Sequence, residues 1–399
     1  MKIEVKESTL VKPMPAKGRS TMRISNLDAA FPETYHTRTL SFYRSTGAAD
    51  FFNTTVLKAA LARTLSVFYP IAGRLKKEKD RVEIDCNGEG AIFIEAEADG
   101  ELSDLGDFGP RPNIGLVPEV DYSQGISSFP LLLVQFFGVE LGGDNFGQTC
   151  IPGFATGDPI SITTWCDIAR GLDISVPPYL DRRVLAARNP PQTKFHHLEF
   201  RPPPPPPPYS NAAVVSDQIR KYSVLKLTRE QLNILKASCE EDDGIGNTSF
   251  YTSFELLTGH AWECLCKARR LPKDQETRLY IMVDGRSRLW PPLPPGYFGN
   301  AVFKATHTAL SGEVESNPLK FTVTKIHDAL ARMDDEYMRS DIDYLEVEGD
   351  LPFNARGTGL YNSPNLGITS WARMPVYDVD FGWGGPFFAG PASFPSMGI

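Results

Sequence analysis

The spacing of apolar residues in the first part of the chain predicts strands interspersed with helices. Residues 1–10 and 39–43 alternate between apolar and polar side chains, as strands with one buried face do. From Asn53 to Leu75 the apolar residues recur at helical spacing. Asn53 is of the residue type that caps a helix N-terminus, so we expect a helix to start there.

The next elements are separated by glycine-bearing segments. Residues 82–85 and 91–94 flank the sequence Cys-Asn-Gly-Glu-Gly, which predicts a β-hairpin. The apolar run 129–137 predicts a buried strand. Residues 165–171 predict a short helix that ends at Gly171.

The second half repeats this mixture of helices and strands. Thr228 and Gln231 have the spacing of a capping box, which predicts a helix N-terminus. Further helices are predicted at 253–269 and 323–344, and strands at 279–283 and 366–371. Both halves are therefore predicted to have α/β structure.

A run of prolines divides the chain. Pro202 to Pro208 cannot enter a helix or the middle of a sheet, and such a run is typical of an extended linker. A ligand for a proline-binding module is the alternative. We predict an N-terminal domain at 1–185, a proline-rich crossover at 186–222 and a C-terminal domain at 223–399.

Composition narrows the class of protein. A chain of 399 residues is long enough for two domains, and a net charge of -8 argues against general nucleic-acid binding. No apolar run is long enough to cross a membrane, and the N-terminus lacks the apolar core of a signal peptide. The cysteines lack metal-site spacing, so Cys264 and Cys266 are expected to be buried thiols. These features fit a cytoplasmic protein.

The sequence Asp380-Phe381-Gly382-Trp383-Gly384 combines two glycines, which permit a sharp bend, with a tryptophan that can be buried beside it. Such a stretch is typical of a structural turn. It also resembles the DFGWG signature of the plant BAHD acyltransferases, and other stretches in that family's order strengthen the resemblance. They are residues 1–8, 68–75, 120–126, 294–300 and 364–371.

This resemblance implies an α/β protein of two domains with chloramphenicol-acetyltransferase-like folds, mixed sheets and a channel between them. It implies a monomeric enzyme that transfers a hydroxycinnamoyl group, such as p-coumaroyl or caffeoyl, from acyl-CoA to a hydroxyl of shikimate or a similar acceptor in lignin metabolism. Acyl-CoA is then a co-substrate, and neither a cofactor nor a metal is expected.

The resemblance also assigns individual residues. It implies that Asp380 forms a buried ion pair with Arg286, away from the reacting groups. It implies that Arg356 binds the acceptor's carboxylate, which suits a guanidinium, and that Thr369 and Trp371 line the acceptor side. From the sequence alone, the alternative for Arg356 is a solvated loop residue, and as isolated residues Thr369 and Trp371 are interpreted as strand core.

The family's general base is the histidine of an HxxxD motif, and this chain lacks it. The interval between Gly142 and Trp165 contains no histidine. The family's spacing, counted back from Trp165, places the catalytic position at Cys150. Counted forward from Gly142, it places the position at Pro152. Taking Asp158 as the motif aspartate gives Phe154. None of these side chains is a general base, so no catalytic residue is assigned.

Two substitutes are conceivable. His36 matches a family position near the channel, although a packed or solvated role is the simpler interpretation. Cys150 could attack the thioester, but no basic neighbour in the sequence lowers its pKa, which favours a buried thiol. The sequence departs from the family pattern at three further positions. Two of them, Arg38 and Leu40, leave the identity of the acyl donor open, and the third is Gly385, directly after the DFGWG stretch.

The chain also ends at Ile399, where the family is expected to continue for further strands, a difference that we expect to lower stability. Three hypotheses follow: a working hydroxycinnamoyltransferase, a relative that binds acyl-CoA or a partner without turnover, or a chain from an incorrectly spliced gene. For this chain the missing histidine favours the second or the third hypothesis. Positioning of the substrates alone can still leave some activity.

Overall fold

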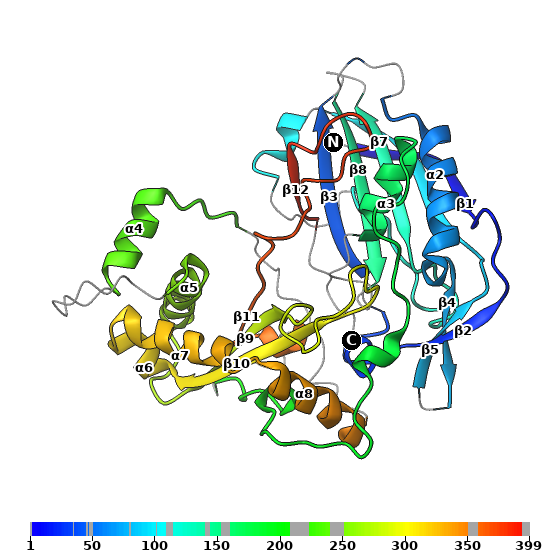
Figure 1. Ribbon diagram of the computed structural model, residues 1–399. Helices are drawn as coiled ribbons and strands as arrows, with labels where there is room; N and C mark the ends of the chain where they lie inside the picture. Colours follow the sequence, from blue (N-terminus) through cyan, green and yellow to red (C-terminus); the bar gives the residue numbers. More distant parts are fainter. Residues whose placement is uncertain are drawn as a thin grey trace.

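The structure is a computed structural model. It describes residues 2–34, 36–44, 47, 51–79, 81–100, 102–108, 115–139, 144–152, 160–207, 223–239, 251–349 and 358–392. Figure 1 shows two α/β parts side by side, one built on a large sheet from the first half of the chain and one built on a smaller sheet from the second half.

The first part is built on a six-stranded sheet with the order β1-β6-β7-β8-β3-β12. Its strands are β1 (Lys2–Val11), β6 (Ala91–Asp99), β7 (Leu133–Val139), β8 (Asp144–Pro152), β3 (His36–Arg44) and β12 (Phe388–Pro391). All neighbours are antiparallel except β6 and β7, which are parallel. The predicted strands at 1–10, 39–43 and 129–137 are confirmed, although the last begins only at Leu133.

The predicted hairpin at 82–94 is wrong, because its two strands belong to different sheets. β5 (Arg81–Cys86) lies in a small sheet between β2 (Ser20–Arg23) and β4 (Arg74–Glu78), whereas β6 joins the large sheet. The chain changes sheets at Gly90, whose φ is +106°. A side chain there would lie 2.3 Å from the carbonyl oxygen of Val11, so glycine lets β6 approach β1.

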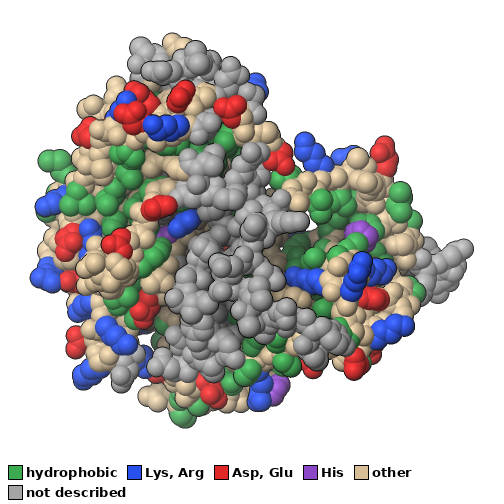
Figure 2. Space-filling model, turned by 180° about the vertical axis from the view of Figure 1, so that it is seen from behind, with side chains coloured by type: hydrophobic (Ala, Val, Ile, Leu, Met, Phe, Trp, Pro, Cys, Tyr) green, Lys and Arg blue, Asp and Glu red, His purple; other side chains and the backbone are tan. Residues whose placement is uncertain are grey.

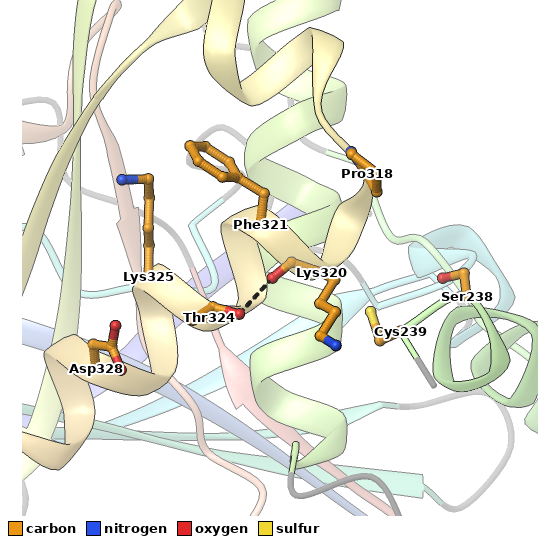
Figure 3. A pocket seen from close by; sticks show the side chains of 8 residues that line it. All are labelled: Ser238, Cys239, Pro318, Lys320, Phe321, Thr324, Lys325 and Asp328. Atoms are coloured by element: carbon orange, nitrogen blue, oxygen red, sulfur yellow. Dashed lines mark hydrogen bonds between the residues drawn. The ribbon is translucent and has the colours of Figure 1, made fainter. Parts of the chain in front are cut away.

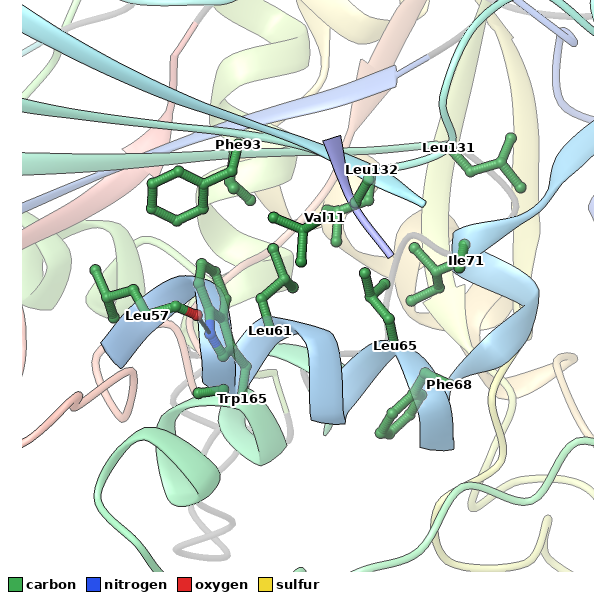
Figure 4. Packing of buried hydrophobic residues seen from close by; sticks show 14 of the residues in the cluster. Val11, Leu57, Leu61, Leu65, Phe68, Ile71, Phe93, Leu131, Leu132 and Trp165 are labelled. Carbon is green, nitrogen blue, oxygen red and sulfur yellow. Dashed lines mark hydrogen bonds between the residues drawn. The ribbon is translucent and has the colours of Figure 1, made fainter. Parts of the chain in front are cut away.

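Two helices cover one face of the large sheet (Figure 1). α2 (Thr54–Val67) begins where Asn53 accepts a hydrogen bond from the amide of Val56, as predicted. It ends at Val67 rather than Leu75, because Phe68 leaves the helical conformation ahead of Pro70. α3 (Ile160–Ala169) packs beside α2, and the indole of Trp165 donates to the carbonyl of Leu57 at 2.9 Å. Figure 4 shows the apolar core between these helices and the sheet.

The second part has a three-stranded sheet with the order β10-β9-β11. Its strands are β9 (Glu276–Asp284), β10 (Val302–Leu310) and β11 (Leu366–Ile368). The helices beyond it are α4 (Arg229–Ala237), α5 (Ser253–Arg269), α6 (Ser311–Ser316), α7 (Leu319–Ala331) and α8 (Asp335–Glu348). The predicted capping box of Thr228 and Gln231 and the helix at 253–269 are confirmed.

Two details of these helices differ from the sequence prediction. The single helix expected at 323–344 is two helices, because Asp334 caps α8 by accepting a hydrogen bond from the amide of Tyr337. On α5 the buried face contains Trp262 and Cys266, whereas Cys264 is exposed. The prediction of a buried thiol is therefore confirmed for Cys266 and wrong for Cys264.

Segments distant in the sequence join the two parts. Within the described part of the crossover, a short 3₁₀ turn lies at Leu198–Phe200, and Pro202–Pro207 form neither helix nor strand. β12, from the end of the chain, pairs with β3 of the first part (Figure 1). The boundaries at 185 and 222 stay a prediction, and the end of the chain does not remain wholly with the second part.

Among the described residues of the surface seen from behind, acidic and basic side chains are interspersed over both parts (Figure 2). In the part of the chain that the structure describes, no helix combines the length and apolar character needed to cross a bilayer.

Candidate active-site region

The positions expected to hold the general base lie near the end of a central strand. β8 is flanked by β7 and β3, and its register places Cys150 opposite Arg38 and Pro152 opposite His36. Positions 150 and 152 are two residues apart on one strand, so they share a face of the sheet. The two sequence counts therefore identify the same side of β8.

The rest of the expected motif interval comes after β8 in the sequence. β8 ends at Pro152, and α3 begins at Ile160. Phe154 and Asp158 lie outside the residues that the structure describes.

His36, the one histidine that the sequence suggested as a substitute, is a buried residue with both ring nitrogens engaged. Its Nδ1 lies 2.8 Å from the hydroxyl of Tyr122, and its Nε2 lies 3.1 Å from the carbonyl oxygen of Pro130. A carbonyl can only accept, so Nε2 carries the proton and Nδ1 accepts from Tyr122. Only 1% of His36 is exposed, and the ring of Phe129 contacts its edge.

This environment makes His36 a poor general base. Burial lowers its pKa to about 4, and the charge of nearby Arg38 contributes in the same direction. Its basic nitrogen faces Tyr122 rather than an open space for substrate. The arrangement holds a neutral imidazole that fixes the start of β3 against Tyr122 and Pro130.

Because the pKa of His36 is lowered, the free energy of unfolding should decrease as the pH falls through the acid range. The unfolded chain, with an ordinary histidine pKa of ~6.5, binds a proton that the folded chain rejects down to pH about 4. At pH 5 we expect a loss of about 2 kcal/mol from this residue. Urea unfolding of the parent and of His36→Gln, followed from pH 7 to pH 4.5, measures it.

The matched control for this pH series is His196→Gln, because His196 is exposed. His307, whose pKa burial also lowers to about 4, adds to the same loss, so His36→Gln should flatten only part of the slope. Identical slopes for the parent and His36→Gln would contradict a neutral, buried His36.

The DFGWG stretch forms a turn that docks on the first part of the molecule. The carboxylate of Asp380 accepts hydrogen bonds from the amides of Gly382 at 2.8 Å and Gly384 at 2.9 Å. Both glycines have positive φ. Phe381 contacts the ring of Trp165, with 5.0 Å between centroids, and Trp383 stacks on Phe52 at 4.6 Å. The loop is thus held by an Asx-type turn and two buried aromatic rings.

The expected ion pair between Asp380 and Arg286 is wrong. Arg286 pairs with Asp284 at 3.1 Å and donates to the carbonyl of Gly299, whereas Asp380 pairs with Arg170, the residue that follows α3, at 4.0 Å. The reason is topological. The turn that carries Arg286 follows β9 in the second part, whereas Asp380 packs beside α3 in the first.

Truncating Asp380 should therefore affect stability rather than proton transfer. Asp380→Ala leaves two turn amides without their acceptor, and we expect a loss of about 1–2 kcal/mol in the free energy of unfolding. Urea unfolding measures it, with Asp378→Ala, an exposed neighbour, as the control. Unchanged stability in Asp380→Ala would show that the carboxylate does not hold the turn.

The residues expected on the acceptor side are only partly placed. β11 pairs in parallel with β9, and Thr369 and Trp371 follow its last residue. Thr369 is exposed and Trp371 is half-buried, so neither is strand core. Arg356 lies outside the described residues, and its proximity to Thr369 stays a prediction.

A buried polar junction between the two parts was not predicted. Asp28, which is 2% exposed, accepts hydrogen bonds from the amide and hydroxyl of Ser25 and from the amide of Asn300. It also forms an ion pair with Arg182, whose guanidinium lies over the ring of Phe298. Only the local capping pattern of Ser25 and Asp28 could be recognised in the sequence.

A pocket of about 650 Å³ lies between the end of α4 and α7 (Figure 3). These helices lie at the far end of the second part from β8 (Figure 1). It is lined by Ser238, Cys239, Pro318, Lys320, Phe321, Thr324, Lys325 and Asp328. Burial raises the pKa of the Cys239 thiol, and Lys325 lies over the ring of Phe321. This lining supplies neither an activated thiolate nor a histidine base.

Comparison with solved structures supports the predicted fold class. The fold is similar to vinorine synthase, with a TM-score of 0.69 and 22% identity over 99% of this chain and 89% of that one. It is also similar to F. sporotrichioides TRI101 complexed with coenzyme A and T-2, with a TM-score of 0.70 and 16% identity over 94% and 89%. The prediction of two chloramphenicol-acetyltransferase-like α/β domains is confirmed.

Sequence comparison then identifies the family. The model of the Transferase family matches residues 1–399. The chain is 49% identical over 405 residues to a shikimate O-hydroxycinnamoyltransferase of Nicotiana tabacum, covering 100% of this chain and 92% of that protein. It is 45% identical over 414 residues to a hydroxycinnamoyltransferase of Narcissus pseudonarcissus, with the same two coverages. The chain therefore belongs to the Transferase family, as a BAHD acyl-CoA-dependent acyltransferase of the hydroxycinnamoyltransferase group.

Proposed function

We propose that this chain transfers a hydroxycinnamoyl group, such as p-coumaroyl or caffeoyl, from coenzyme A to a hydroxyl of shikimate or a similar acceptor. The observation that supports this most is the 49% identity, along the whole chain, to a shikimate O-hydroxycinnamoyltransferase. The reaction belongs to phenylpropanoid metabolism, and we propose that it takes place in the cytoplasm in a monomeric enzyme.

The chemistry is an acyl transfer. The acceptor oxygen attacks the thioester carbonyl, the C–O bond forms, the C–S bond breaks, and the sulfur leaves with a proton as free coenzyme A. We propose that Arg356 binds the acceptor's carboxylate, and that Thr369 and Trp371 line the acceptor side. A guanidinium suits a carboxylate because its N–H groups can form two parallel hydrogen bonds.

A second candidate function is binding of acyl-CoA without turnover. It is favoured by one observation, the lack of any histidine between His36 and His196, together with the hydrogen bonds that occupy both nitrogens of His36. Loss of a general base reduces acyl transfer by ~10²–10⁴-fold without abolishing substrate binding.

Incubation of the purified chain with p-coumaroyl-CoA and shikimate tests the proposal. Free thiol and ester are measured together, and calorimetry measures binding of the acyl-CoA. Ester and thiol in equal amounts support the transferase. Binding without either product supports the second candidate, and neither binding nor product contradicts both. Thiol without ester indicates hydrolysis, which a reaction without shikimate identifies.

A further inference from the structure

Three titratable side chains of different kinds meet inside the second part of the molecule. His197 directly precedes the 3₁₀ turn of the crossover, Glu199 lies within that turn, and Asp341 belongs to α8. His197 is 1% exposed, and Glu199 and Asp341 are 0% exposed. One ligand atom from each side chain lies within 4.8 Å of the other two.

Asp341 distinguishes this cluster from an ordinary buried hydrogen-bond network. Both of its carboxylate oxygens are buried, and neither has a hydrogen-bond partner in the described part of the chain. A buried charged group without partners is strongly destabilising unless something compensates it. Glu199 beside it carries a second formal negative charge, which increases the need for a cation.

We propose that His197, Glu199 and Asp341 bind one divalent metal ion, and that Zn²⁺ is the ion that fits them best. Two carboxylates and a neutral imidazole leave the site electrically neutral when they bind a dication. Imidazole nitrogen and carboxylate oxygen are ligands that zinc uses in proteins. His197 Nδ1 and Glu199 Oε1 are already 2.9 Å apart, close enough for neighbouring ligands of one ion.

The surrounding hydrogen bonds would hold these ligands in place. His197 Nε2 lies 2.9 Å from the hydroxyl of Ser340, so metal at Nδ1 leaves Nε2–H to donate to that oxygen. The hydroxyl of Tyr337 lies 3.0 Å from both carboxylate oxygens of Glu199. Metal ligands are commonly oriented by such outer contacts.

The competing occupant of the cluster is a proton. Burial and the charge of Glu199 raise the pKa of Asp341, whereas Lys304 of β10 acts in the opposite direction. A protonated Asp341 would remove one charge without any metal. The two occupants differ in what they predict for the variant Asp341→Asn, which imitates the protonated acid but is a poor metal ligand.

The site, if loaded, would fasten the crossover to α8. Residues 197–199 and Asp341 are far apart in sequence, so one ion bound to both would stabilise the folded chain without taking part in acyl transfer. This inference does not depend on the proposed activity.

Metal content and thermal unfolding of the untagged protein test the proposal. The protein is treated with chelator, dialysed, and titrated with Zn²⁺ or Co²⁺. We expect one equivalent of metal per chain, and a rise in Tm of about 3 °C at a hundredfold excess over Kd. Asp341→Asn should bind less than a tenth of an equivalent and show no Tm rise. Glu348→Gln, an exposed carboxylate on the same helix, should behave like the parent.

Metal that binds at the surface, outside the proposed site, is controlled separately. Cys264 and His260 lie 3.6 Å apart on α5 and could bind Co²⁺ outside the proposed site. Cys264→Ser should therefore keep the full equivalent. Loss of metal in Cys264→Ser but not in Asp341→Asn would overturn the proposal. A parent that binds no metal, together with an Asp341→Asn variant as stable as the parent or more so, would also overturn it and assign a proton to the cluster.

Discussion

The variant Pro152→His is expected to form the ester ~10²–10⁴-fold faster than the parent chain, because it supplies a general base at one of the positions to which the sequence counts assign it. Position 152 lies at the end of β8, directly opposite His36 on β3. Directly opposed residues of an antiparallel pair have Cβ atoms about 4.5–5.5 Å apart on the same face. The new imidazole would therefore stand beside a neutral His36 rather than beside a cation.

The neighbouring positions provide matched controls for this gain. Cys150→His tests the other sequence count, and its opposed residue is Arg38, whose charge should lower the pKa of the new imidazole. Ile151→His places a histidine on the other face of β8, where no gain is expected. The rates are measured as ester formation from p-coumaroyl-CoA and shikimate at saturating substrate. A real gain should also follow the titration of a group with a pKa near ~6.5.

A fast parent enzyme would contradict this interpretation. If the parent already makes ester as fast as Pro152→His, another group takes the proton, and two further variants identify it. Loss of activity in His36→Gln would assign the base to His36 despite its lowered pKa. Loss in Cys150→Ser, with an acyl group trapped on the parent's thiol, would indicate covalent catalysis by Cys150.

The parts of the fold that the sequence predicted well depend on local interactions. Asn53 caps α2, and Thr228 with Gln231 forms a capping box on α4, because each pattern involves residues within one helical turn. The helix at 253–269 was predicted from its apolar spacing, and the structure shows that Thr252 and Glu255 also form a capping box at its start. Helical spacing and capping residues do not need a distant partner to be recognised.

The errors arose where a distant partner decides the structure. β5 and β6 look like a hairpin, yet β1 and β7 take β6 into the large sheet. Asp334 ends one helical pattern and caps the next, which the continuous apolar spacing of 323–344 concealed. Single-sequence patterns report which face of an element is apolar, but they do not report which element covers it.

The same difference between local and distant interactions applies to the candidate site. The sequence assigned the expected base to the interval between Gly142 and Trp165 and showed that this interval contains no histidine, but it did not predict β8 there. It could not show that both nitrogens of His36 are engaged, because Tyr122 and Pro130 are distant in the sequence. It also paired Asp380 with Arg286, although the fold places Asp380 against Gly382, Gly384 and α3. Side chains with nonlocal partners therefore required the structure.

The junction formed by Asp28 supports the second large prediction. Asp28→Ala removes the acceptor of three hydrogen bonds and the partner of Arg182. Arg182 is itself buried, and its Nε and Nη2 have no hydrogen-bond partner among the described residues. Without Asp28 its charge would remain in the interior uncompensated, and breaking a buried pair in this way costs about 3–5 kcal/mol. We expect a loss of that size in the free energy of unfolding.

A surface ion pair on either side of Arg182 in the sequence gives the control that separates the effect of burial from the effect of charge. Asp181 and Arg183 lie 2.6 Å apart, but the Arg183 side chain is 88% exposed, so Asp181→Ala should cost much less stability than Asp28→Ala. Urea unfolding of both variants measures the difference. Asp28→Asn keeps one acceptor oxygen without the charge and should fall between the parent and Asp28→Ala. Equal small losses for Asp28→Ala and Asp181→Ala would show that water reaches the junction, and that the buried ion pair does not hold the two parts together.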